Sequence, residues 1–146
     1  MTTNDSKYDL FKAELSIAQG QMDKYDQLSS SMKTWAITLW AAAIGWSIQT
    51  HIPTVVLIGT ASTILFWFMD AYIMTFRLNY KDRRNAAAEA LRAYADMQEF
   101  PSGAPVLEFP THENGGLMRT LSILHISLPY LALLVFSVAA FFLIVR

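Results

Sequence analysis

Cysteine is absent from this chain of 146 residues. Its absence excludes disulfide bonds, thiol nucleophiles and thiolate metal ligands. A cleavable signal peptide is not expected either, because the residues before position 33 are polar and contain no early apolar segment. No stretch carries a recognisable catalytic motif. The sequence therefore predicts a protein that is not an enzyme and needs no cofactor.

Charge is almost absent from three apolar runs, 34–50, 54–76 and 123–145. Each is close to the length of about 17 to 25 residues that a helix needs to cross a bilayer. Asp70 is the one residue in these runs that carries a formal charge. The pattern predicts an all-α integral membrane protein with three transmembrane helices, and the lipid bilayer is its first expected partner.

Basic residues are distributed unevenly about these runs, which predicts the orientation of the chain. Arg146 alone follows the third run. The positive-inside rule therefore places the N-terminus in the cytoplasm and the C-terminus in the periplasm. The net charge of −1 and the lack of a basic stripe indicate no nucleic-acid binding. The basic residues on the expected cytoplasmic side are Lys7, Lys12, Lys24, Lys33, Arg77, Lys81, Arg83, Arg84, Arg92 and Arg119.

A narrow apolar seam precedes the first run and another follows the second. Proline does not interrupt the chain before position 53, so we expect one long helix from about Ser6 to Gln49. A turn at 51–53 would fold a second long helix back along it, and both seams would be buried in a cytoplasmic antiparallel hairpin. The alternative is a pair of frayed amphipathic helices on the membrane surface. The first seam comprises Tyr8, Phe11, Leu15, Ala18, Met22 and Tyr25, and the second Phe76, Tyr80, Ala87, Leu91 and Tyr94.

These predictions describe one membrane domain, 1–146. Its expected parts are a cytoplasmic helix at 1–33, a first span at 34–50, a second at 53–76, a second cytoplasmic helix at 77–100, an extended loop at 101–116 and a third span at 120–145. Three prolines and three glycines in the loop exclude a helix there. Pro129 predicts a kink in the third span.

Asp70 is the strongest candidate functional residue, because an ionisable side chain within a span is costly. Counting along the helices places Lys33 and His125 near its level. Three interpretations stay open: a structural ion pair that fixes helix register, a proton- or ion-sensing cluster, and a carboxylate exposed at the interface.

Small residues form a second feature of the first two spans. Small side chains let helix backbones approach closely in lipid. Some of them would serve the hairpin itself, and others would contact a second copy of the chain in a homo-oligomer. The expected packing residues are Ala41, Gly45, Gly59, Ser62 and Thr63.

A basic cluster follows the second span just inside the membrane. It comprises Arg77, Lys81, Arg83 and Arg84. It predicts an orientation signal with contacts to anionic lipids, and a phosphate-binding site is the alternative. His51 and His112 are isolated in the sequence, so no metal site is expected.

Three segments together resemble the SLATT-type and related two-span effectors encoded beside bacterial antiphage systems. The segments are YDLFK at 8–12, MKTWAITL at 32–39 and FWFMDAY at 66–72. The resemblance covers residues 8–95 and leaves the third run unexplained. It implies a helical protein of the bacterial inner membrane that oligomerises and perturbs the membrane when activated, and it supplies no catalytic residues.

Three functions follow from these features. The first is a non-enzymatic, self-associating protein that forms a pore or disrupts the membrane in antiphage defence. The second is an accessory or scaffold subunit that anchors a soluble cytoplasmic partner. The third is a small proton-coupled transporter or membrane enzyme that uses Asp70 and His125.

Overall fold

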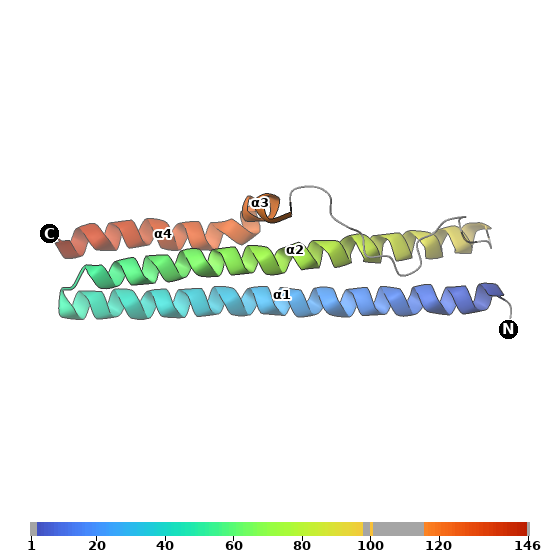
Figure 1. Ribbon diagram of the computed structural model, residues 1–146, viewed down its shortest axis with the longest axis horizontal. Coiled ribbons are helices and arrows are strands. Elements are labelled where there is room, and N and C mark those ends of the chain that lie inside the picture. Colours follow the sequence, from blue (N-terminus) through green and yellow to red (C-terminus); the bar gives the residue numbers. More distant parts are fainter. Residues whose placement is uncertain (1–2, 98–99, 101–115, 146) are drawn as a thin grey trace. The chain divides into compact units, whose positions relative to one another are not determined.

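The protein is all-α. The computed structural model describes residues 3–97, 100 and 116–145. These residues form four helices (Figure 1): α1 (Thr3–Thr50), α2 (Thr54–Met97), α3 (Gly116–Leu121) and α4 (Leu124–Val145). The first two are long, with 48 and 44 residues. The expected extended loop falls almost entirely on residues 101–115, which lie outside the described part of the chain, as does His112.

The turn between α1 and α2 lies where the sequence places it. α1 ends at Thr50, and His51 follows in the left-handed conformation with a φ of 56°. A residue in this conformation is a common way to end a helix. The Ser47 hydroxyl donates to the Ile52 carbonyl at 2.7 Å, and this hydrogen bond closes the turn. Proline cannot donate a backbone hydrogen bond, so Pro53 suits the position before α2.

α1 and α2 form a packed antiparallel pair, as the seams predict. Their residues divide into two compact units. The charged unit comprises the described residues among 3–26, 76–97 and 100, and the apolar unit comprises 27–75 and 116–145. Within each unit, the facing residues are those roughly equidistant from the turn.

The charged unit has a small apolar core. Phe11 from α1 packs against Ala87 and Ala90 from α2, and Leu15, Leu91 and Phe100 surround them. Tyr8 lies against Tyr94, with ring centroids 5.8 Å apart.

Tyr25 stacks on Phe76 at the other end of the same seam, with ring centroids 6.0 Å apart. Burial, and the neighbouring Tyr80, raise the pKa of the Tyr25 phenol. The phenol therefore stays protonated and uncharged at physiological pH, and the ring packs as an apolar group.

The third apolar run differs from the continuous helix expected over 120–145. A short helix, α3, ends at Leu121, and α4 begins at Leu124. α4 then continues through Pro129 to Val145. Near its start the Ser127 amide and hydroxyl both bond to the Ile123 carbonyl, at 3.0 and 3.2 Å.

Two helices are long and apolar enough to cross a membrane. One is the α2 segment Thr54–Asp96, with a mean hydropathy of 1.6 in its most apolar window, and the other is the α4 segment Leu124–Ile144, with 2.3. α1 does not meet the same criterion among the described residues. Its apolar half contains Thr, Ser, Gly and three Trp residues, which lower the mean hydropathy.

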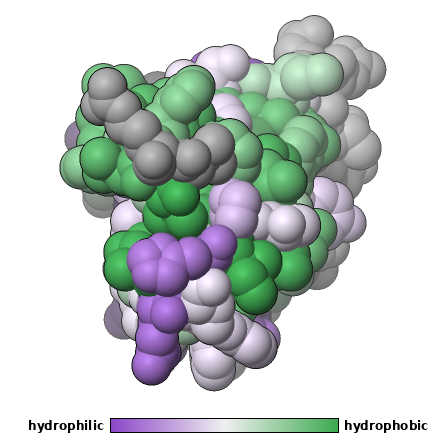
Figure 2. Space-filling model, turned by 90° about the vertical axis from the view of Figure 1, so that its left-hand side faces the viewer, coloured by the Kyte–Doolittle hydropathy of each residue, from purple (hydrophilic) through white to green (hydrophobic). Residues whose placement is uncertain are grey.

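The apolar unit buries polar side chains and exposes large apolar ones. In Figure 1, α4 lies along α2 within this unit, and its C-terminal end lies beside the α1–α2 turn. The face at that end carries a small hydrophilic group that reaches the lower edge of the view, with hydrophobic residues to either side and residues of intermediate hydropathy below (Figure 2). The polar residues of the described part of the chain that are at most 6% exposed all belong to this unit: Ser29, Ser47, Thr63, Asp70, Thr120, Ser127 and Ser137. All exposed large apolar side chains of those residues also belong to it, except Tyr8, Leu10, Ile17 and Phe76.

Candidate functional site in the apolar unit

A buried ion pair joins α1 and α2. The Lys33 ammonium lies 3.0 Å from Oδ2 of Asp70, whose side chain is fully buried. The antiparallel register brings them together, because Lys33 lies 18 residues before His51 and Asp70 lies 19 after it. Lys33 also donates to the Ser29 hydroxyl one turn earlier, at 2.6 Å.

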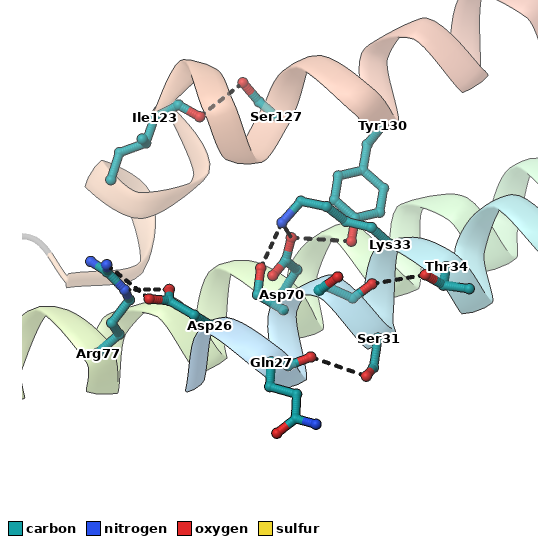
Figure 3. Close-up of polar contacts among 12 residues, drawn as sticks. Asp26, Gln27, Ser31, Lys33, Thr34, Asp70, Arg77, Ile123, Ser127 and Tyr130 are labelled. Atoms are coloured by element: carbon teal, nitrogen blue, oxygen red, sulfur yellow. Dashed lines mark hydrogen bonds and ion pairs between the residues drawn. The ribbon is translucent and has the colours of Figure 1, made fainter. Parts of the chain in front are cut away.

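Tyr130 brings α4 into the same cluster. Its hydroxyl donates to Oδ2 of Asp70 at 3.2 Å, and its side chain is almost completely buried. Figure 3 shows Lys33, Asp70 and Tyr130 converging from three helices. The carboxylate therefore links α1, α2 and α4.

The prediction that His125 is the third member of this cluster is wrong. His125 is exposed, and Tyr130, five residues later, takes its place. The prediction assumed a helix running from 120. Because α4 begins at Leu124 instead, His125 lies in its first turn. Tyr130 and Ser29 were missed, since neither residue type marks a site by itself.

A second polar contact links α1 with α4 farther toward the turn. The Trp40 indole N–H donates to the Ser137 hydroxyl at 2.7 Å, and that hydroxyl donates to the Leu133 carbonyl at 2.9 Å. Thr63 similarly bonds to the Gly59 carbonyl on its own helix at 2.9 Å. Such bonds satisfy buried hydroxyls without water.

No family model matches the chain, and no curated protein or solved structure matches it either. The resemblance to SLATT-type effectors therefore stays a prediction.

The expected packing residues separate into two groups. At Gly59 an added Cβ would lie 2.8 Å from the Ala43 Cβ, so the missing side chain allows α1 and α2 to approach. Thr63 is buried one turn later, and Ser62 is half-buried. Ala41 and Gly45 are exposed, and an added Cβ at Gly45 would meet no packing neighbour within 4 Å among the described residues.

Most residues of the basic cluster form polar contacts within the charged unit. Arg77 forms a bidentate pair with Asp26, with Nη2 and Oδ2 3.0 Å apart. Arg84 contacts the Gln19 side chain at 3.4 Å. Lys81 is exposed.

The Arg83 guanidinium donates to the Glu14 carboxylate, and both side chains are largely buried. The hydrogen bond to Glu14 raises the pKa of Arg83. Because Arg77 and Arg83 neutralise carboxylates of α1, their main structural role is to hold the two helices together, and they are poorly placed to bind a phosphate.

The buried cluster has the chemistry of a structural site. Lys33 and Asp70 neutralise one another, and Tyr130 and Ser29 supply further hydrogen bonds. In the part of the chain that the structure describes, no three His, Asp or Glu side chains are grouped to hold a metal ion.

Proposed function

We propose that the protein is a three-span membrane protein whose copies associate through α1. The distribution of side chains in the apolar unit is the observation that supports membrane insertion. Its polar side chains are buried, and large apolar ones such as Leu65 and Phe142 are exposed. Only 28% and 22% of the most apolar 18-residue windows of the two helix segments are buried, whereas the core helix of a soluble protein is mostly buried.

The second half of α1 crosses the bilayer with them in this proposal. Lys33 and Trp40 tie it to α2 and α4 by the contacts described above. Trp35 and Trp46 are 60% and 63% exposed and lie near the two ends of the apolar run. Tryptophan is enriched at both membrane–water interfaces, so these side chains fit the two interfacial belts. With the basic residues inside, the N-terminus is cytoplasmic in a bacterial inner membrane.

Self-association through α1 accounts for the small residues that packing within the chain does not use. Ala41 and Gly45 are one turn apart and exposed, together with Thr34 and Thr38 on the same side of α1. The two threonine hydroxyls bond to carbonyls of their own helix, at 3.1 and 2.8 Å. The side chains on this side of α1 are therefore small, and the two threonine hydroxyls are already hydrogen-bonded. Such a surface suits close contact between helices in lipid.

The activity proposed for such an assembly is permeabilisation of the membrane on activation, as the resemblance to antiphage effectors implies. The second candidate is an anchoring subunit for a soluble partner. It is favoured by the charged unit, whose apolar core and ion pairs have the character of a soluble helical pair.

Cross-linking tests the contact through α1. Because the chain has no cysteine, single variants Ala41→Cys and Gly45→Cys introduce one thiol each. Oxidation in native membranes should convert both to disulfide-linked dimers. The matched control is Leu131→Cys, at an exposed position of α4. Dimers formed by the control but not by the α1 variants would overturn this assignment.

Membrane potential tests the activity. Overproduction in bacteria, with the infecting phage present as a trigger, should depolarise cells that carry the parent chain. Gly45→Leu should abolish depolarisation while insertion into the membrane is retained. An unchanged potential in the parent strain, together with retention of a soluble protein at the membrane, would favour the anchoring subunit.

A further inference from the structure

Two buried polar atoms one helical turn apart on α2 have no hydrogen-bond partner among the residues that the structure describes. They are the indole nitrogen of Trp67 and Oδ1 of Asp70. Buried polar atoms in folded proteins are nearly always paired, because an unpaired one loses its bonds to water without replacement. Positions three residues apart lie on the same face of a helix. The two atoms therefore call for a common explanation.

Trp67 also belongs to the buried cluster through its ring. It stacks on Tyr130, with ring centroids 6.5 Å apart and an angle of 14° between the planes. Tyr130 directs its hydroxyl to Oδ2 of Asp70. Two stacked aromatic rings thus each carry a polar group, and one of these groups, the Tyr130 hydroxyl, is bonded directly to the Asp70 carboxylate.

The chemistry of these two atoms limits which group can form a hydrogen bond with both of them. An indole N–H only donates, and a carboxylate oxygen only accepts. A proton on Oδ1 would leave Trp67 still unpaired and would add a second donor. A metal cation would be repelled by the Lys33 ammonium, which lies 3.0 Å from the other carboxylate oxygen. A small neutral molecule that accepts one hydrogen bond and donates another satisfies both atoms.

We propose that Trp67 and Asp70 bind one water molecule within the helix bundle. The water accepts a hydrogen bond from the Trp67 indole and donates one to Oδ1 of Asp70. Asp70 is then bonded on both oxygens, by Lys33 and Tyr130 on Oδ2 and by the water on Oδ1. The proposal is independent of the self-association proposed above, and either can fail without the other.

The indole N–H signals of the full chain in lipid nanodiscs test this site. The chain has four tryptophans, and Trp67→Phe identifies the Trp67 signal by its loss while keeping an aromatic ring beside Tyr130. In the parent chain, that signal should show a nuclear Overhauser cross-peak to a water with a long residence time. Trp40 is the internal control, because its N–H already donates to Ser137 at 2.7 Å and should show no such peak.

Two substitutions of Asp70 show whether the cross-peak comes from a bound water or from exchange of the indole proton with bulk solvent. Asp70→Asn keeps a polar group at the position of Oδ1: with the amide oxygen toward Lys33 and Tyr130, the amide N–H can donate to the water, and the cross-peak should persist. Asp70→Leu removes the acceptor, and the cross-peak should be lost even if Trp67 stays in place. A Trp67 signal without a water cross-peak in the folded parent chain would overturn the proposal, as would a cross-peak that survives in the folded Asp70→Leu variant.

Discussion

The Lys33 ammonium and the Asp70 carboxylate meet 3.0 Å apart, from α1 and α2. Their exposures differ, since the Lys33 side chain is 23% exposed and Asp70 is fully buried. A long lysine side chain can bend its charge toward the interface, whereas a short aspartate cannot. The pair is therefore unequal, and removal of each partner should have a different effect.

The first prediction concerns this inequality. Lys33→Met should leave Asp70 unpaired and reduce the free energy of unfolding by about 3–5 kcal/mol, the usual cost of breaking a buried pair. Asp70→Leu should cost less, because Lys33 can reach the interface. Asp70→Asn should cost least among the three, because the amide still accepts from Tyr130.

Steric-trap unfolding in bicelles measures these changes. The double variant Lys33→Met with Asp70→Leu removes both charges and should recover most of the loss. A double variant as unstable as the sum of the two single variants would show that the pair has no coupling energy.

The second prediction contrasts two glycines. Gly59→Ala should destabilise the protein by about 1–3 kcal/mol, because the new Cβ would lie 2.8 Å from that of Ala43. Adding Ala43→Gly should relieve the clash. Gly45→Ala would meet no packing neighbour within 4 Å in the described part of the chain and should be neutral or stabilising by up to about 1 kcal/mol from helix propensity. Equal effects at the two glycines would contradict the packing described here.

The third prediction concerns Glu14 and Arg83 in the charged unit. Either Glu14→Ala or Arg83→Ala should strand a largely buried charge and speed hydrogen exchange of the neighbouring amides at least tenfold, about 1.4 kcal/mol. The exchanged pair, Glu14→Arg with Arg83→Glu, should restore protection. Gln19→Ala is the control, since Gln19 is exposed and its contact with Arg84 is long. Failure of the exchanged pair to restore protection would indicate that the site depends on more than opposite charge.

The fourth prediction is topological. If α1, α2 and α4 all cross the bilayer, the two ends of the chain lie on opposite sides. If only α2 and α4 cross, both ends lie on the same side. A reporter fused before Thr2 should therefore be active in the cytoplasm, and one fused after Arg146 should be active only in the periplasm. Activity of both fusions in one compartment would rule out the three-span proposal.

Much of the helical architecture can be predicted from the sequence alone. The absence of proline before position 53 predicts a long first helix, and the nearly uncharged runs predict the apolar segments of α2 and α4. The hairpin register also follows from the sequence. Residues in two continuous helices are placed by counting 1.5 Å per residue from the turn, and this places Lys33 opposite Asp70.

The tertiary structure decides two features that cannot be predicted by counting residues along a helix. The third member of the buried cluster depends on where α4 begins, and the break between α3 and α4 shifts that start so that Tyr130 replaces His125. Likewise, Gly45 and Gly59 are both glycines within apolar runs of the sequence. Only the rotation of each helix about its own axis turns Gly59 toward Ala43 and leaves Gly45 exposed, because that rotation is set by the packing of all the side chains together.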